Sequence, residues 1–350
     1  MKLINVKDYE DEAKKVLPHD SWNYIYGASE DEITKRDNAI GFKNYKLIPR
    51  VLNDVNDRNY SSSILGSAIS SPILLAPTSP MKMAHPDGEL AQVRAAKKLD
   101  TIAICSTDSH FSLEDLAYEG NDKLWFQLCC YADRSCVEQM IVRAERSKYK
   151  ALVITVDAFY PARRERMIRS DFSVPSDIQM GNLLHLDIPT KYIRNDGSVK
   201  RFALTWNDLI WVKAITKLPI ILKGVMHPED VAKAVGFGIQ AVIISNHGGR
   251  QVDQSPSSIS CLSDAVNVAN GQMDILIDGG ITRGTDILKA KALGAKAVLI
   301  GRSYIYGLAV NGQQGIEDVY NILLNEMDVA MSQLGISDIN EINKSCLKFV

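Results

Sequence analysis

Eight short, continuously apolar runs recur along the 350-residue chain, and helix-like stretches separate several of them. The runs do not alternate apolar with polar residues, which is typical of strands buried on both faces of a parallel sheet. They are PILLAP (72–77), TIAICS (101–106), KLWFQL (123–128), ALVITV (151–156), PIILKG (219–224), AVIISN (241–246), DILIDG (274–279) and AVLIGR (297–302). A chain that must bury so many parallel strands has few architectures open to it.

Amphipathic segments follow four of these runs, at 89–99, 135–147, 227–238 and 284–294, and two of the segments end at a glycine suited to a C-terminal cap. The repeated alternation of strand and helix predicts an α/β fold, the (β/α)8 or TIM barrel. An open doubly wound sheet is the alternative. That fold requires a glycine-rich fingerprint after its first strand, and APTSPM (76–81) is not one.

Two segments lie outside this repeat. Residues 1–70 are expected to form helices and a short capping element that closes the barrel floor. Residues 158–205 form an overlong connection between the fourth and fifth strands, rich in turn formers, which we interpret as an active-site lid. The whole chain, residues 1–350, is predicted to be one barrel domain.

Charge and composition exclude several classes of protein. The formal net charge of −2 gives no electrostatic reason to expect nucleic acid or an anionic membrane as a partner. The six cysteines include no Cys-x-x-Cys pair and no Cys/His cluster with zinc spacing, so reduced, buried thiols and no metal are expected. MKLINVKDYEDEAKK has no secretory apolar region, and LKFV is not the peroxisomal address, so a cytoplasmic location is expected.

Polar residues stand where the apolar strands end. In a β/α barrel the catalytic groups come from the carboxyl ends of the strands, so this contrast favours an enzyme. The residues are Thr78, Ser79, Ser106, Gln127, Thr155, Asp157, Lys223, Ser245, His247, Arg250, Asp278, Gly280, Gly301 and Arg302.

The last two strand ends carry a phosphate signature. DGGITRG (278–284) and IGRS (300–303) each place glycine directly before a predicted helix. Free backbone N–H groups at a helix N-terminus bind phosphate, and Arg283 and Arg302 can add charge-assisted hydrogen bonds. The sequence therefore predicts a phosphate group held by these two loops, as in many barrels.

SNHGGRQVD (245–253) places an imidazole and a guanidinium beside a closely approached ligand. Histidine is suited to general base catalysis near neutral pH, and arginine binds a carboxylate through two parallel hydrogen bonds. We therefore predict His247 as the base, with Asp157 orienting it and stabilising its cationic form. Lys223 is costly to bury unpaired, and as a buried cation it would stabilise negative charge that develops on a bound ligand.

These motifs resemble the FMN-dependent 2-hydroxy acid oxidase and dehydrogenase family, which includes glycolate oxidase and lactate oxidase. The resemblance runs from LINVKDYEDEAKKVLP to about residue 340, through APT with KMAHPDGE, FQL, TVD with RRE, LPIILKGV, SNHGGRQVD, DGGITRGTD and IGR. It implies a barrel that holds FMN, with the phosphate near Gly280, Arg283, Gly301 and Arg302. It also implies a homotetramer or larger homo-oligomer.

The resemblance also implies roles for individual residues. His247 would be the catalytic base, helped by Asp157, and Tyr24, Arg164 and Arg250 would hold an anionic substrate. Whether the proton comes from the α-carbon or from the hydroxyl stays open. The flavin would lie against residues at the strand ends, which are Pro77, Thr78, Ser79, Ser106, Gln127, Thr155, Lys223, Ser245 and Asp278.

Three positions depart from the family pattern. Cys129 stands where the family usually has a tyrosine, Asp108 replaces a bulky aromatic residue, and Ser79 replaces an alanine or glycine. A thiol is a weak hydrogen-bond donor. A carboxylate at position 108 would repel a small substrate anion, or attract a cationic or hydroxyl-bearing substrate. Two hypotheses therefore stay open. The first is oxidation of an (S)-2-hydroxy acid through FMN, with oxygen or another acceptor. The second is a flavoprotein with drifted chemistry, such as amine or modified-peptide oxidation, non-redox isomerisation, or weakly active flavin binding.

Overall fold

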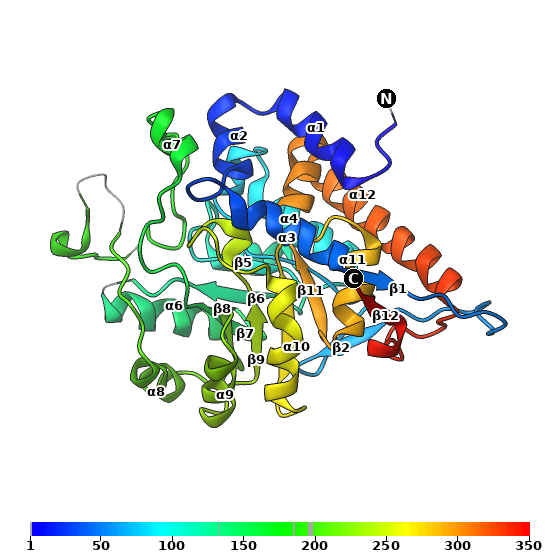
Figure 1. Ribbon diagram of the computed structural model, residues 1–350. Helices are drawn as coiled ribbons and strands as arrows, with labels where there is room; N and C mark the ends of the chain where they lie inside the picture. Colours follow the sequence, from blue (N-terminus) through cyan, green and yellow to red (C-terminus); the bar gives the residue numbers. More distant parts are fainter. Residues whose placement is uncertain (1, 132, 185, 195–198) are drawn as a thin grey trace.

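The computed structural model describes residues 2–131, 133–184, 186–194 and 199–350. Eight parallel strands within this part of the chain form a barrel surrounded by helices, which confirms the predicted fold (Figure 1). Each predicted apolar run supplies most or all of one strand. The strands are β4 (Ile73–Leu75), β5 (Ile104–Ser106), β6 (Trp125–Leu128), β7 (Ala151–Thr155), β8 (Ile220–Val225), β9 (Ala241–Ile244), β10 (Asp274–Asp278) and β11 (Ala297–Ile300).

The strand order around the sheet is β4, β11, β10, β9, β8, β7, β6, β5. The two ends of this order meet through a parallel bridge between Leu75 and Ala103. Leu75 N donates a hydrogen bond to Ile102 O across the same seam, at 3.0 Å. The sheet is therefore a nearly closed ring, and all the carboxyl ends of its strands meet at one rim.

Both faces of the ring are buried, which explains the continuous apolar runs. Leu74 and Ile104 belong to an inner cluster that fills the barrel, with Trp125 and Val153. Leu75, one residue after Leu74, packs outward into the core between the strands and the helices. Because successive side chains point to opposite faces, two cores form from the same runs.

At least one α-helix follows each strand of the barrel. Local sequence sets several of their ends. Thr205 and Asp208 form a capping box at the start of α8, and Gly238 and Gly294 lie beyond α9 and α11 with positive φ values of 63° and 106°. The helices are α4 (Gly88–Lys98), α5 (Leu113–Glu119), α6 (Arg134–Arg146), α8 (Trp206–Ile215), α9 (Pro228–Gly236), α10 (Ser258–Ala269), α11 (Gly284–Ala292) and α12 (Arg302–Leu334).

The N-terminal residues divide between the two ends of the barrel. The hairpin of β2 (Ser62–Ile64) and β3 (Ser67–Ile69) places Ile64 and Ile69 in the inner cluster beside the first residues of several strands, so the hairpin closes the floor. The N-terminal helices do not join it there. They are α1 (Val6–Val16), which packs on α12, and α2 (His19–Tyr26) and α3 (Ile33–Gly41), which reach the opposite rim (Figure 1). β1 (Tyr45–Leu47) pairs antiparallel with β12 (Leu347–Phe349) near the C-terminus.

The long connection after β7 contains a short helix, α7 (Glu165–Arg169). It is tied to the barrel at several points. Buried Asn182 donates to Thr107 O at 2.9 Å and accepts from Leu113 N at 2.7 Å. Residues 185 and 195–198 of the predicted lid lie outside the described residues. The interpretation of this segment as a lid stays a prediction.

The floor hairpin provides a test of how the barrel is stabilised. Ile64 is fully buried in the inner cluster, so Ile64→Ala should lower the free energy of unfolding by about 2–5 kcal/mol, the usual cost of such a core truncation. Urea denaturation at a fixed FMN concentration measures this. Ile4→Ala, at a 62% exposed position, is the control and should change little. Equal midpoints for the two variants would contradict a structural role for the hairpin.

Candidate active site

A cavity of about 380 Å³ opens at the carboxyl ends of the strands, which is a size suited to a cofactor or substrate. It brings together most of the residues selected from the sequence. Those that line it are Tyr24, Pro77, Thr78, Ser79, Ser106, Asp108, Gln127, Cys129, Thr155, Arg164, Lys223, His247, Arg250, Asp278, Gly280, Gly301 and Arg302. Asp157 and Ser245 lie behind this lining, in contact with His247 and Lys223 respectively. Arg283 does not line the cavity.

Lys223 reaches the cavity from the middle of β8 and is almost completely buried. Its Nζ lies 3.0 Å from Asp278 Oδ2 and donates to Ser245 Oγ at 3.1 Å. Burial lowers the pKa of Lys223, but the carboxylates of Asp278 and Asp157 outweigh burial and hold the pKa above its ordinary value. The strand therefore presents a permanent cation inside the barrel mouth.

The imidazole of His247 lies beside the carboxyl group of Asp157. Its Nδ1 is 3.1 Å from Oδ1 and 3.2 Å from Oδ2 of that residue. Gly224 makes this pairing possible, because a Cβ at Gly224 would overlap the Asp157 carboxyl group. Since Nδ1 is committed to Asp157, Nε2 is the ring nitrogen that remains to take a proton from a ligand.

The electrostatic surroundings set the charge states of this pair. Burial lowers the pKa of His247 below its ordinary value of 6.5, and Asp157 opposes the shift only in part. Burial acts to raise the pKa of Asp157, but His247 and Lys223 outweigh it and lower the pKa. At neutral pH the pair is therefore a neutral imidazole beside an ionised carboxylate, which is the state a general base requires.

The loop that carries His247 has an unusual backbone. His247, Gly248 and Gly249 have φ values of 57°, 63° and 76°, in the left-handed region. Such strain persists where surrounding contacts enforce it, and here Asn38 and Asn246 exchange two amide hydrogen bonds of 2.8 Å. Sequence reasoning missed Asn38, which lies on a helix outside the barrel repeat.

Two partly buried arginines, Arg164 and Arg250, line the cavity. Arg250 Nη1 donates to Tyr24 O at 2.6 Å and to Gly27 O at 3.0 Å. Arg164 Nε is buried and has no hydrogen-bond partner among the described residues. Among the described residues, neither guanidinium has an acidic partner. Burial lowers the pKa of both arginines. An anionic ligand would relieve both the desolvation and the mutual repulsion.

A chain of polar groups crosses the neighbouring wall. Ser106 Oγ donates to Gln127 Oε1 at 3.0 Å, and Gln127 Nε2 donates to Thr155 Oγ1 at 2.9 Å. Cys129 Sγ lies 3.2 Å from the same amide nitrogen. Burial raises the pKa of Cys129 to about 11, so this residue stays a thiol. The hydroxyl of Tyr24 donates to Ser79 O at 2.7 Å and keeps its lone pairs.

The predicted phosphate loops are close to one another at the far end of the cavity. A Cβ at Gly280 would overlap Asn38 O, so only glycine fits there. A Cβ at Gly301 would have no atom nearer than 3.9 Å, so a larger residue would fill the cavity space. Arg302, the first residue of α12, donates to three carbonyl oxygens, those of Ile25, Gly27 and Gly248.

Arg283 was predicted to lie in this phosphate site, and its position does not support that role. Its Nη1 donates to Glu326 Oε1 at 2.6 Å, on α12, and its side chain is half exposed. The residue precedes α11 directly and turns outward, and Thr282 lines the cavity instead. Spacing along a helix N-terminus could not decide which of two adjacent side chains faces the ligand.

Lys35 supplies a cation that sequence reasoning missed. It lines the cavity on α3, and its side chain is only 15% exposed. Its Nζ lies 3.0 Å from the centroid of the Tyr26 ring and 3.4 Å from Glu32 Oε2. Burial, assisted by the charge of Arg302, lowers the pKa of Lys35 to about 7. The signal that could have found it is the spacing of 35, 38 and 39 on one helical face.

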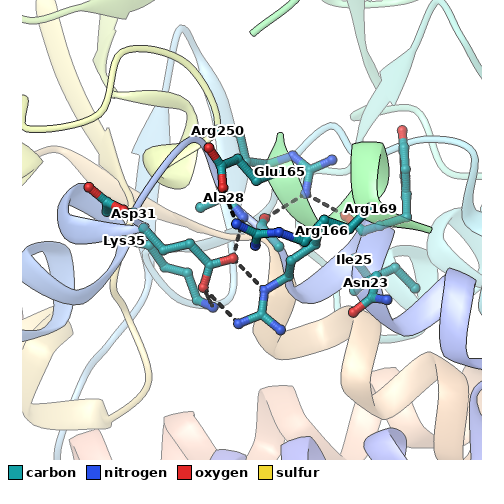
Figure 2. A network of polar contacts seen from close by, with 12 residues as sticks. Asn23, Ile25, Ala28, Asp31, Lys35, Glu165, Arg166, Arg169 and Arg250 are labelled. Carbon is teal, nitrogen blue, oxygen red and sulfur yellow. Dashed lines mark hydrogen bonds and ion pairs between the residues drawn. The ribbon is translucent and has the colours of Figure 1, made fainter. Parts of the chain in front are cut away.

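Lys35 belongs to a polar network that joins α3 to the long connection. Arg166 of α7 and Lys35 both reach Glu32, with Arg166 Nε donating at 2.6 Å (Figure 2). Burial acts to raise the pKa of Glu32, but Arg166 and Lys35 outweigh it and lower the pKa to about 2. The network therefore pairs one ionised carboxylate with Arg166 and with Lys35, which is only partly protonated near neutral pH. A bound anion would favour the charged form of Lys35.

A histidine paired with a carboxylate, partly buried guanidinium groups and glycine-lined loops at the mouth of a β/α barrel are typical of a cofactor-dependent enzyme of the barrel class. Comparison with known proteins identifies the family. The model of the FMN-dependent dehydrogenase family matches residues 13–349, and the chain belongs to this family. FMN is accordingly its cofactor.

Individual relatives are similar over nearly their whole length. A 2-hydroxyacid oxidase of Dictyostelium discoideum is 42% identical, covering 99% of this chain and 90% of that protein. A peroxisomal (S)-2-hydroxy-acid oxidase of Oryza sativa subsp. japonica is 41% identical, covering 98% and 95%. The structure of a soluble mutant of the membrane-associated (S)-mandelate dehydrogenase from Pseudomonas putida superposes with a TM-score of 0.95, at 34% identity and full coverage of both chains.

The residues present fit FMN. The open side of Gly301, the N-terminus of α12 and the cations Lys35 and Arg302 suit a phosphate. Asp278 lines the cavity, and its Oδ1 is a buried acceptor with no partner among the described residues, which suits a hydroxyl of the sugar chain. Lys223 supplies the cation that a flavin ring requires when it accepts electrons.

The proposed phosphate site leads to a prediction that distinguishes the role of Lys35 from that of Arg283. Lys35→Met should weaken FMN binding by about tenfold, since a hydrogen bond to a charged group is lost, while riboflavin binding should not change because riboflavin has no phosphate. Titrating the apoprotein with each flavin and following flavin fluorescence measures both. Arg283→Met removes the same charge outside the cavity and should leave both affinities unchanged. Equal weakening of both flavins by Lys35→Met would rule out a phosphate contact.

Proposed function

We propose that this protein oxidises a 2-hydroxy acid to the corresponding 2-oxo acid, with FMN as its cofactor. The observation that carries the proposal is the His247–Asp157 pair in one cavity with the unpaired guanidinium groups of Arg164 and Arg250. A base for the hydroxyl-bearing carbon and an anion site for the neighbouring carboxylate are the two requirements of this reaction. The names of the relatives support the same reaction class.

Substrate binding rests on charge. The carboxylate of the substrate binds Arg164 and Arg250, whose burial excludes water and strengthens the attraction. Tyr24 lies over Arg250, with 5.0 Å between the guanidinium carbon and the ring centroid, and so restricts the orientation of that side chain. The guanidinium groups thereby place the hydroxyl-bearing carbon of the substrate in the cavity that His247 lines.

Proton removal falls to His247. Nε2 accepts a proton from the substrate, and the imidazolium that forms is stabilised by the carboxylate of Asp157 at Nδ1. Bound FMN supplies the acceptor for the two electrons that leave the substrate. The cation of Lys223, held by Asp278 and Ser245, stabilises negative charge in this part of the cavity.

The alternative, a flavoprotein with drifted chemistry, is not favoured by the relatives. The presence of Asp108, which was one argument for that alternative, also supports it less than the sequence suggested. Asp108 was expected either to repel a small substrate anion or to attract a cationic or hydroxyl-bearing substrate. Its carboxylate pairs with Arg201 at 2.6 Å and accepts a hydrogen bond from Tyr131, which reduces the expected repulsion. Sequence reasoning missed Arg201 because it lies in the long connection, far from any strand end.

Location and assembly remain predictions. No helix within the described residues is long and apolar enough to cross a membrane. The cytoplasmic location proposed from the sequence stands beside a relative named as peroxisomal, so fractionation of the native cells is the deciding measurement. The proposed homotetramer or larger assembly is tested by light scattering of the purified holoprotein.

The proposed role of His247 as the base leads to the first functional prediction. His247→Gln should leave the protein folded and yellow while slowing anaerobic flavin reduction by about 10²–10⁴-fold, the usual contribution of general base catalysis. Stopped-flow absorbance with a panel of (S)-2-hydroxy acids measures this rate. His19→Gln, at a position with 81% of its side chain exposed, is the control. Reduction of the His247 variant at the parent rate would overturn the assignment.

The pH dependence follows from the same pair. The base works only when His247 is neutral, so kcat/KM should be constant near neutral pH and fall with acid. Because burial lowers the pKa of His247, the midpoint should lie below 6.5. Asp157→Asn removes a charge that raises this pKa, so it should move the midpoint to still lower pH and reduce the plateau. A midpoint above 6.5, or one that Asp157→Asn does not move, would contradict this account.

A further inference from the structure

The wall of the cavity near Cys129 carries an ion pair that the proposed reaction does not use. Asp108 follows β5 and Arg201 lies in the connection before α8, and both line the cavity. Arg201 Nη2 donates to Asp108 Oδ2 at 2.6 Å, and the hydroxyl of buried Tyr131 donates to Asp108 Oδ1. Both carboxylate oxygens therefore have a donor.

The position of Arg201 is fixed by its backbone as well as by this pair. Arg201 forms an antiparallel bridge with Tyr131, and Phe202 N donates to Cys130 O at 3.1 Å. Its Nη1 donates to Ala158 O at 3.0 Å. The guanidinium is therefore held in place over the end of β6.

The pair is charged and lies close to the substrate site. The carboxylate of Asp108 is the largest influence on Arg201 and raises its pKa. Arg201 and Asp108 line the same cavity as Arg164, the residue proposed to bind the substrate carboxylate. A substrate whose carboxylate binds Arg164 therefore has its side chain within reach of a charged wall.

We propose that Asp108 and Arg201 form the subsite for the substrate side chain, and that this subsite selects 2-hydroxy acids whose short side chain carries an oxygen acceptor. The inference rests on the proposed function and narrows its substrate class. It assigns to Arg201 a role in specificity, distinct from the binding of the substrate carboxylate by Arg164 and Arg250.

The physical reason is desolvation. An alkyl or aromatic side chain would remove water from the Asp108–Arg201 pair without replacing its hydrogen bonds, which is costly for charged groups. Arg201 has five N–H groups, and among the described residues it donates one to Asp108 and one to Ala158. The remaining N–H groups can bind a hydroxyl or carboxylate oxygen of the substrate, which replaces the lost water.

Two pairs of substrates of matched shape test the proposal. L-Glycerate and (S)-2-hydroxybutyrate differ in a hydroxyl against a methyl group, and (S)-malate and (S)-2-hydroxy-4-methylpentanoate differ in a carboxylate against an isopropyl group. Anaerobic flavin reduction by the holoenzyme gives kcat/KM for each acid. The oxygen-bearing member of at least one pair should be favoured by about tenfold or more, because sites built for a hydrogen bond reject the analogue that lacks it. The pair that shows the preference identifies a hydroxyl or a carboxylate as the group bound.

Variants of the subsite make the test specific. The double variant Asp108→Asn/Arg201→Met removes both charges, so no unpaired carboxylate is left to repel the substrate anion. It should remove the preference by lowering kcat/KM for the oxygen-bearing acid about tenfold or more, with little loss for its alkyl partner. Arg201→Lys should keep part of the preference. Arg169→Met, on the same connection with 74% of its side chain exposed, is the matched control and should change neither ratio. An equal loss for both members of a pair would show that Arg201 maintains the fold of the connection and not the specificity.

The outcomes separate this inference from the proposed function. Binding of the same acids to the His247→Gln holoprotein, followed by the change in flavin absorbance, does not require turnover. Reduction by hydroxy acids without any preference for oxygen-bearing members would overturn the subsite and keep the proposed function. Failure of every acid to reduce the wild-type flavin would overturn the proposed function. In that case the binding ratios still decide the subsite, since an absent preference in binding would reject it.

Discussion

The hydrogen bond from Leu75 N to Ile102 O and the bridge between Leu75 and Ala103 join the first barrel strand to the second. This seam brings the two ends of a parallel sheet together into a nearly closed ring. In an open sheet the end of β4 and the end of β8 would lie far apart, whereas in the ring their ends share one rim. The meeting of Thr78 and Lys223 in one cavity therefore depends on closure, and the floor hairpin supports closure by filling the opposite end.

The properties of the cavity then depend on which of its charged side chains have a partner of opposite charge. Asp278, Asp157 and Asp108 each have a basic partner. Among the described residues, Arg250 and Arg302 donate to carbonyl oxygens and have no acidic partner, and Arg164 Nε has no hydrogen-bond partner. An unmatched buried cation is costly, and a bound anion removes the cost. The matched pairs are Lys223 with Asp278, His247 with Asp157, and Arg201 with Asp108. The excess positive charge is therefore located where a substrate carboxylate is needed.

Much of this arrangement could be predicted from the sequence, because strand ends in a barrel converge whatever the loops do. His247 and Lys223 were found in this way, as the residues that end apolar runs. Arg283 was misplaced because two adjacent residues at a helix start point in different directions, and spacing alone does not tell which one faces inward. Lys35 and Arg201 were missed because they lie on α3 and on the long connection, outside the repeat that orders the rest.

The sequence by itself determined the eight strands, their parallel arrangement, the end of the barrel where polar side chains gather, and most of the residues that line the cavity there. Those properties follow from local periodicity and from the geometry common to all such barrels. Only the tertiary structure decided which charges are paired and which remain free. Asp108 looked like an unmatched carboxylate until the long connection placed Arg201 beside it. Pairing depends on how segments distant in sequence pack together, and a linear spacing of residues carries no information about that packing.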